Sequence, residues 1–170
     1  MFWTSKASRD RGRRFLFFCP GCRRRPRERI QVNQINVEVN VADDSLRVLL
    51  VDDEESYLQT AAKVLRRCGF DVELCTTGQD AVDLLRQRMC QVVVLDLKMP
   101  GMNGQEVLGK IRDHHPAVQV IILTGHASAD DAAACLTRGA FDFLVKPVDM
   151  SHLMERVRTA YEIWKLSPAR

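Results

Sequence analysis

The chain has 170 residues, of which 46% are hydrophobic and 28% are charged, enough for one domain of ordinary size and some surplus. No apolar run approaches the roughly 18 to 20 residues that a membrane-spanning helix needs. We therefore exclude a transmembrane protein and expect a soluble, cytoplasmic one.

The formal net charge of +3 is unevenly distributed along the chain. Residues 1–30 contain ten Lys or Arg and two acids, a net charge of +8, so the remainder carries −5. A block of one charge with little hydrophobic periodicity is typical of a disordered extension, and we expect residues 1–45 to form one. This basic block could also contact nucleic acid or anionic lipid nonspecifically. We do not expect nucleic acid to be a partner of the protein.

The extension has two other interpretations. The five apolar residues after Arg14 are fewer than the about 7 to 15 of a secretory signal, so we reject export. Translation could also begin within residues 31–45, which would make the basic block an artefact of gene calling.

The six cysteines fall into two groups. Cys19 and Cys22 form a lone CxxC without a second pair or a His cluster to complete a zinc site, and we interpret the spacing as incidental. The other four, from Cys68 to Cys135, lie in predicted helices, strands or their ends, where free cysteines behave as small buried hydrophobes.

From Leu46 onward, short aliphatic runs alternate with helical patterns. In the first helix, for example, Leu58, Ala61, Ala62 and Leu65 fall at i, i+3, i+4 and i+7. The predicted strands span residues 47–51, 71–74, 91–95, 118–123 and 141–145. The predicted helices span residues 55–68, 78–89, 104–114, 128–138 and 149–164.

The composition of the strands favours a buried parallel sheet. Strands made almost only of Val, Ile and Leu need both faces covered, which indicates helices on either side. Helix starts at Thr77 and Ser128 and helix-ending glycines at Gly69 and Gly139 support the same boundaries. The pattern predicts an α/β fold of five βα units with right-handed crossovers, in which sites form at the carboxyl ends of the strands.

Polar side chains gather at that edge of the predicted sheet. Asp52 and Asp53 follow the first strand and Asp96 the third. Thr124 follows the fourth strand and Lys146 the fifth. Three converging carboxylates repel one another unless a hard divalent cation such as Mg2+ lies between them, so we predict a metal site.

The same five residues suit phosphoryl transfer. A carboxylate can attack a phosphoryl group to form an acyl phosphate when a metal and a cation neutralise the developing charge. Asp96 is the candidate nucleophile, and Asp52 and Asp53 are the candidate metal ligands. Lys146 would pair with one phosphoryl oxygen, and the Thr124 hydroxyl would donate a hydrogen bond to another.

Four motifs in this order resemble the receiver domains of bacterial two-component response regulators. They are Val51-Asp52-Asp53-Glu54, Asp96-Leu97-Lys98-Met99-Pro100-Gly101-Met102-Asn103-Gly104, Leu123-Thr124-Gly125-His126 and Phe143-Leu144-Val145-Lys146-Pro147. The resemblance covers residues 46–166 and implies a flavodoxin-like, doubly wound (βα)5 fold whose five-stranded parallel sheet has the order 2-1-3-4-5. Because only residues 167–170 follow, we expect a stand-alone receiver without an output domain.

The resemblance also implies a function. The chain would take phosphate on Asp96 from a sensor histidine kinase or a phosphotransfer protein. Mg2+ would be bound by Asp53, Asp96 and the backbone carbonyl of Lys98, with Asp52 acting partly through water. The protein would be no enzyme but a receiver with Mg2+-dependent self-phosphorylation and autodephosphorylation at Asp96. The Lys146-Pro147 peptide would be cis.

Thr124 and Phe143 would transmit the signal. Phosphate on Asp96 would draw in the Thr124 hydroxyl, and the Phe143 ring would rotate into the vacated space. This would change the face made by the fourth helix, the fifth strand and the fifth helix, where a homodimer or an unknown downstream protein could bind. The alternative is that Phe143 is only a partly buried strand aromatic.

Other classes fit the residues less well. A haloacid-dehalogenase-like phosphatase needs a second acid two residues after the nucleophile, where this chain has Lys98. A flavodoxin-like nucleotide binder would have Ser, Thr or Gly after the first strand in place of acids. A degenerate receiver would lack one of the site residues, and none is missing. The remaining alternative is the receiver part of a DNA-binding transcriptional regulator that lacks its effector domain.

Overall fold

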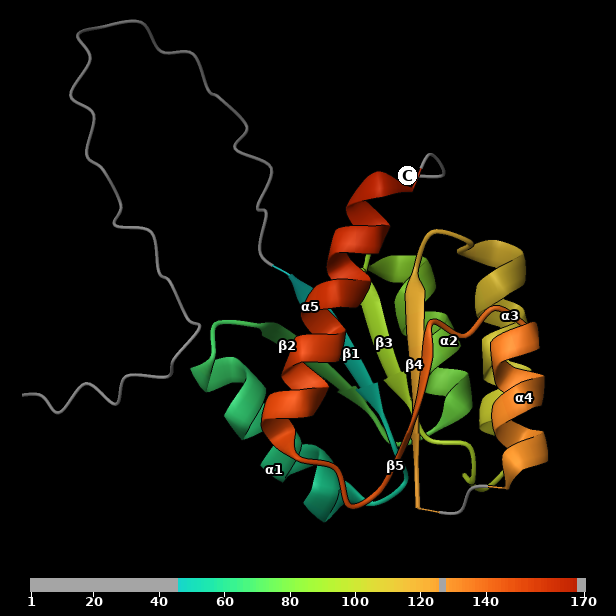
Figure 1. The fold of residues 1–170 in the computed structure, drawn as a ribbon, viewed down its shortest axis with the longest axis horizontal. Coiled ribbons are helices and arrows are strands. Elements are labelled where there is room, and N and C mark those ends of the chain that lie inside the picture. The colour runs from blue at the N-terminus through green and yellow to red at the C-terminus, as the bar shows by residue number, and fades with distance from the viewer. Residues whose placement is uncertain (1–45, 126–127, 168–170) are drawn as a thin grey trace, which may run out of the picture. The chain divides into compact units, whose positions relative to one another are not determined.

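The computed structural model describes residues 46–125 and 128–167. The predictions made for residues 1–45, including the CxxC of Cys19 and Cys22, lie outside the described residues. Within the described ranges, five strands alternate with five helices (Figure 1). The strands are β1 (Arg47–Val51), β2 (Asp71–Cys75), β3 (Val92–Leu95), β4 (Gln119–Thr124) and β5 (Asp142–Val145). The helices are α1 (Glu55–Arg67), α2 (Gly78–Gln87), α3 (Gly104–His114), α4 (Ala129–Thr137) and α5 (Met150–Leu166).

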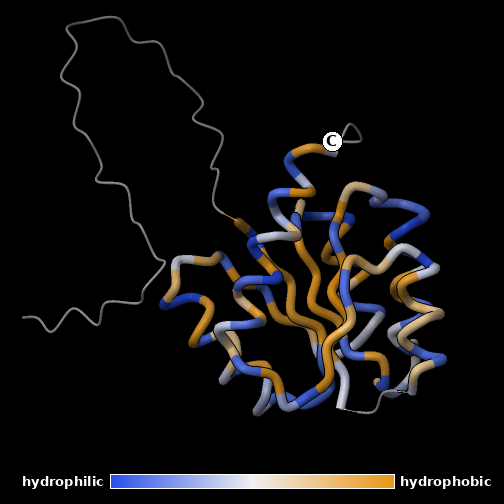
Figure 2. The backbone as a smooth tube through the Cα atoms, in the orientation of Figure 1, coloured by the Kyte–Doolittle hydropathy of each residue, from blue (hydrophilic) through white to orange (hydrophobic). Residues whose placement is uncertain are grey.

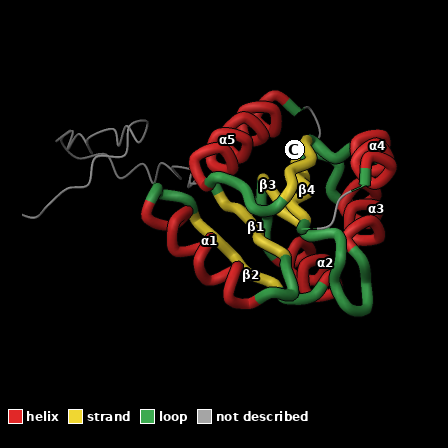
Figure 3. The backbone as a smooth tube through the Cα atoms, turned by 60° about the horizontal axis from the view of Figure 1, so that its bottom comes forward, coloured by secondary structure: helices red, strands yellow, loops and turns green. Residues whose placement is uncertain are grey.

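These strands form one parallel sheet in the order β2-β1-β3-β4-β5 across the described part of the chain. This confirms the predicted fold and strand order. Helices α1 and α5 lie on one face of the sheet, and α2, α3 and α4 lie on the other (Figure 3). The helix that follows β1 and the helix that follows β3 therefore lie on opposite faces of the sheet. This arrangement opens a crevice at the carboxyl ends of these two strands.

Each face of the sheet buries an apolar cluster, and Figure 2 shows the apolar residues concentrated along the strands. On one face, Val93 packs in a cluster with Leu108 of α3. On the other, Val94 belongs to a cluster with Leu58 of α1 and Leu153 of α5. Successive strand residues thus enter opposite clusters, which explains why the strands are apolar at every position rather than alternating.

The helix ends follow the predicted signals. Thr77 caps α2 and Ser128 caps α4, and each side chain accepts a hydrogen bond from the backbone N–H three residues on. Gly69 and Gly139 follow α1 and α4 with φ angles of 91° and 93°, the left-handed conformation that favours glycine. A capping box at Asn103 begins α3 as well.

The boundaries differ from the predictions by at most two residues. Gln91, Val118 and Phe141 precede their strands rather than belonging to them. Thr124 is the last residue of β4, not the first residue after it, because it still pairs with Val145 of β5.

None of the helices in the described part of the chain has both the length and the apolar character that crossing a bilayer requires.

Gly104, at the start of α3, packs against the backbone that carries Asp96. A Cβ at this position would lie 2.2 Å from the Asp96 carbonyl oxygen and 2.7 Å from the Leu97 Cα. The Gly104 N–H donates to the Leu97 carbonyl oxygen at 2.9 Å. Since a side chain cannot fit in this contact, glycine is what allows α3 to dock on the loop after β3.

We expect Gly104→Ala to lower the free energy of unfolding by about 1–3 kcal/mol or more, because the added methyl group is accommodated only if backbone moves. Gly109→Ala is the matched control, since an added Cβ in the same helix meets nothing within 4 Å, and it should stabilise by about 0.5–1 kcal/mol. Urea unfolding followed by circular dichroism measures both. Equal, small effects of the two substitutions would contradict the close docking of α3.

Candidate functional site

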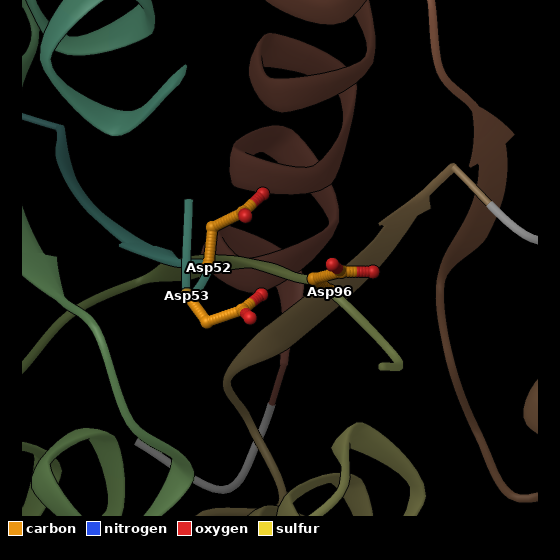
Figure 4. A group of neighbouring side chains, drawn as sticks. All are labelled: Asp52, Asp53 and Asp96. Carbon is orange, nitrogen blue, oxygen red and sulfur yellow. The ribbon is translucent and has the colours of Figure 1, made fainter. Parts of the chain in front are cut away.

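Three carboxylates meet at the carboxyl ends of β1 and β3 (Figure 4). The two strands are parallel neighbours with Val51 opposite Leu95, so Asp52 and Asp96 leave them side by side. The Asp96 N–H donates to the Val51 carbonyl oxygen at 2.9 Å, which extends the pairing by one residue. Carboxylate oxygens of Asp52, Asp53 and Asp96 all lie within 4.8 Å of one another.

The three acids differ in burial. Asp52 and Asp96 are only 3% and 7% exposed, whereas Asp53 is exposed. Two of the three negative charges are therefore largely removed from water, and Asp53 is the member of the group that solvent reaches most easily.

Lys146, directly after β5, reaches both buried acids. Its Nζ forms an ion pair with Asp52 Oδ2 and lies 3.7 Å from Asp96 Oδ2. The backbone N–H of Lys146 donates to the Thr124 carbonyl oxygen at 2.9 Å, and the Lys146-Pro147 peptide is cis, as the resemblance to receiver domains implies. A single ammonium group thus offsets part of the repulsion between the two carboxylates.

Thr124 and Phe143 occupy the neighbouring strands. Thr124 is fully buried at the end of β4, at the same edge of the sheet as the acids, because β3 and β4 are parallel neighbours with Leu95 opposite Ile122. Phe143 of β5 is half-buried and packs against the apolar cluster under α2 and α3. The structure thus places all five predicted polar residues, Asp52, Asp53, Asp96, Thr124 and Lys146, at one edge of the sheet, and Phe143 lies on the adjacent strand β5.

Comparison with known proteins agrees with this arrangement. Residues 48–158 match the family described as the response regulator receiver domain. The chain belongs to this family.

Relatives of this receiver domain include longer proteins. The transcriptional regulatory protein ZraR of Escherichia coli O157:H7 is 33% identical over 117 residues, which are 69% of this chain and 26% of ZraR. The chain therefore spans about a quarter of the length of that curated relative.

Solved receiver structures resemble the whole sheet and its helices. A CheY-like receiver domain protein from Methanospirillum hungatei JF-1 has a TM-score of 0.70 and 27% identity, over 72% of this chain and 98% of that chain. The CheX–CheY–BeF3–Mg2+ complex from Borrelia burgdorferi has a TM-score of 0.65 and 27% identity, over 68% of this chain and 89% of that chain.

Burial raises the pKa of the Asp52 carboxyl in this receiver domain. The hydrogen bond from Lys146 and a hydrogen bond of 3.0 Å from the Glu54 N–H to Asp52 Oδ1 oppose this shift, while the negative charge of Asp96 adds to it. Removal of the carboxylate from water therefore outweighs the stabilising effect of its partner cation.

The two oxygens of Asp96 have different surroundings. Oδ1 accepts a hydrogen bond from the Leu97 N–H at 2.7 Å, and the Lys98 N–H lies 3.4 Å away. Oδ2 is the oxygen that faces Lys146. The backbone therefore fixes one oxygen and leaves the other on the side of the ammonium group. The side chain of Lys98 is exposed.

The donor set fits a hard divalent cation. Mg2+ is usually held by one or two carboxylates, with its other positions filled by water or phosphate oxygens. The three aspartates supply carboxylate oxygens at close mutual distances, and one of them is open to solvent. Receiver domains generally bind Mg2+ in an acidic pocket of this kind.

Tyr57 is a residue of the site that the sequence reasoning does not include. It lies in the first turn of α1, and the Lys146 Nζ lies 4.4 Å from the centroid of its ring. An aromatic residue four positions after Asp53, at the start of the helix that follows the acids, is the available sequence signal. That signal is weak, because the same position also suits a residue that packs in the core.

The raised pKa of Asp52 predicts a pH dependence that Asp52→Asn removes. The folded chain favours the protonated Asp52 carboxyl. As the pH rises, the unfolded chain therefore loses this proton first, near the ordinary pKa of 3.8. The free energy of unfolding of the wild type, compared with that of Asp52→Asn, should therefore fall as the pH rises from the unfolded-state pKa of Asp52 to its folded-state pKa. Above the folded-state pKa the difference should stay constant.

Urea unfolding at a series of pH values in Mg2+-free buffer measures this difference. A wild type that instead gains stability over the variant as the pH rises would mean that the ion pair with Lys146 outweighs burial.

Proposed function

We propose that this receiver domain is a phosphorylation-operated switch in which Asp96 accepts a phosphoryl group from a histidine kinase or a phosphotransfer protein. The observation that carries the proposal is the meeting of Asp52, Asp53 and Asp96 at one edge, with the Lys146 ammonium beside both buried carboxylates. Membership of the receiver family and the fold of residues 46–166 support it.

In the proposed transfer, Oδ2 of Asp96 is the nucleophile. The Leu97 N–H holds Oδ1 at 2.7 Å, which orients the carboxylate and leaves Oδ2 toward Lys146. As the new oxygen–phosphorus bond forms and the bond to the donor breaks, negative charge spreads over the phosphoryl oxygens. Lys146 turns from Asp52 to one of these oxygens, and the Thr124 hydroxyl donates a hydrogen bond to another.

Asp53, Asp96 and the backbone carbonyl of Lys98 would hold Mg2+, with Asp52 acting partly through water. When bound, the ion supplies positive charge that offsets both the carboxylate repulsion and the charge developing on the phosphoryl group. The complex of a related CheY with BeF3 and Mg2+ supports this ligand chemistry. Hydrolysis of the acyl phosphate at the same site would reset the switch.

Phosphorylation would then alter the face formed by α4, β5 and α5. Thr124 would move toward the phosphoryl group, and the half-buried Phe143 ring would turn inward. Apolar side chains on these elements already face solvent, since Leu136, Val145 and Ile163 are 47%, 51% and 45% exposed. This face would bind a downstream protein or a second copy of the chain.

A second candidate function is control of transcription. The 33% identity to the transcriptional regulatory protein ZraR favours a receiver that governs a DNA-binding effector. Gene context and the size of the native protein decide between this function and a stand-alone receiver.

Incubation with Mg2+ and acetyl phosphate should give an acid-stable, base-labile adduct that Asp96→Asn abolishes, because the amide is not nucleophilic. Asp113→Asn, the same change at an exposed position of α3, is the control and should leave the yield unchanged. Intact-protein mass spectrometry measures both. An undiminished adduct in Asp96→Asn would refute the assignment of the nucleophile.

Mg2+ should raise the thermal unfolding midpoint of the wild type, because an ion that binds only the folded chain stabilises it by mass action, by about 2.7 kcal/mol at a hundredfold excess over the dissociation constant. Asp53→Asn should lose most of this shift, whereas Asp83→Asn, the same change at a side chain of α2 that is 45% exposed, should keep it. A full shift in Asp53→Asn would exclude that residue as a ligand.

A further inference from the structure

The ring of Tyr57 lies against the Lys146 ammonium group, which is also paired with an acid. The Nζ of Lys146 lies 4.4 Å from the centroid of the Tyr57 ring and is ion-paired with Asp52. Only 15% of the Lys146 side chain is exposed. A cation over an aromatic face is attracted by the negative face of the ring, and the attraction is largest where water is excluded.

The environment of Tyr57 keeps its hydroxyl protonated and the side chain therefore uncharged. Burial raises the pKa of the hydroxyl to about 12, and the negative charges of Asp52, Glu54 and Asp96 add to this shift. The buried Tyr57 Oη has no hydrogen-bond partner among the described residues. Tyr57 also lines a cavity of about 10 Å3 together with Asp52 and Asp96, so the side chain forms part of the wall of the site. Among the described residues, the contact between Tyr57 and Lys146 is made by the ring and not by a hydrogen bond of the hydroxyl.

We propose that Tyr57 is a positioning residue for phosphoryl transfer: its ring face confines the Lys146 ammonium to the side of Asp52 and Asp96. This inference rests on the proposed function of Asp96. Lysine carries its charge on a flexible four-carbon stem, and the proposed transfer requires this charge to pass from Asp52 to a phosphoryl oxygen on Asp96. The ring restricts the ammonium to a region from which Asp96 Oδ2 is only 3.7 Å away.

The central test is the rate of phosphorylation by acetyl phosphate with saturating Mg2+. We expect Tyr57→Leu to lower this rate about three- to thirtyfold, the range that corresponds to loss of a cation–π contact. Tyr57→Phe keeps the ring face and should stay within about twofold of the wild type on the same scale.

Tyr161→Leu is the matched control. It removes the same side chain from a similar contact, since the Lys165 Nζ lies 4.9 Å from the Tyr161 ring centroid on α5. This substitution should leave the rate unchanged. A loss of rate in Tyr161→Leu equal to that in Tyr57→Leu would show a general effect of core truncation and overturn the inference.

Two further measurements separate positioning from packing. Phe analogues with increasing ring fluorination at position 57 keep the shape of the ring but weaken its negative face, so the rate should fall with each added fluorine. In a Lys146→Met background, Tyr57→Leu should cause no further loss, because the ring acts through the ammonium group. The inference would be overturned by a phosphorylation rate that does not change with fluorination. It would also be overturned if Tyr57→Leu lowered the rate equally in the wild-type and Lys146→Met backgrounds.

The outcomes also distinguish this inference from the proposed function. A wild-type chain that takes no phosphate overturns both. A wild-type chain that is phosphorylated at Asp96, with an unchanged rate in Tyr57→Leu, overturns the role of Tyr57 alone.

Discussion

Two buried carboxylates held side by side are the constraint on which this site depends. Asp52 and Asp96 follow neighbouring parallel strands and are almost completely removed from water. Like charges about 4 Å apart repel by roughly 4 kcal/mol at an effective dielectric constant of about 20. Lys146 offsets part of this repulsion in the chain alone. The remaining negative potential is what makes the edge suitable for a divalent cation and, with that cation, for a phosphoryl group.

The strand order makes this arrangement possible with residues from distant parts of the chain. Asp52 and Lys146 are 94 positions apart in sequence, yet both follow strands that end at the same edge of the sheet. Asp96 lies between them because β3 separates β1 from β4 and β5. Gly104 then lets α3 dock directly on the backbone that carries Asp96. The backbone at Asp96 is thus in direct contact with the start of α3.

The sequence predicted the strands, the helices and the acids that follow the strands because these features depend on local patterns, whereas the strand order that brings the acids together was implied by the resemblance to receiver domains. Apolar runs define the strands, and residues such as Thr77 and Gly69 define helix ends by their own conformational preferences. The parts that could not be predicted depend on packing between elements. The contact of Tyr57 with Lys146, the unequal burial of Asp52 and Asp53, and the different surroundings of the two Asp96 oxygens arise only after α1, β1 and β5 are assembled. The roles in phosphoryl transfer, metal binding and switching stay predictions for all the site residues, which are Asp52, Asp53, Asp96, Lys98, Thr124, Phe143 and Lys146.

The central claim is that Asp96, rather than its acidic neighbours, carries the phosphoryl group. Borohydride reduction of the phosphorylated chain converts an aspartyl phosphate to homoserine, and peptide mass spectrometry locates the converted residue. We expect homoserine at position 96 and unchanged aspartate at positions 52 and 53. Homoserine at Asp52 or Asp53, or at no aspartate in a chain that has been treated with Mg2+ and acetyl phosphate, would contradict this claim.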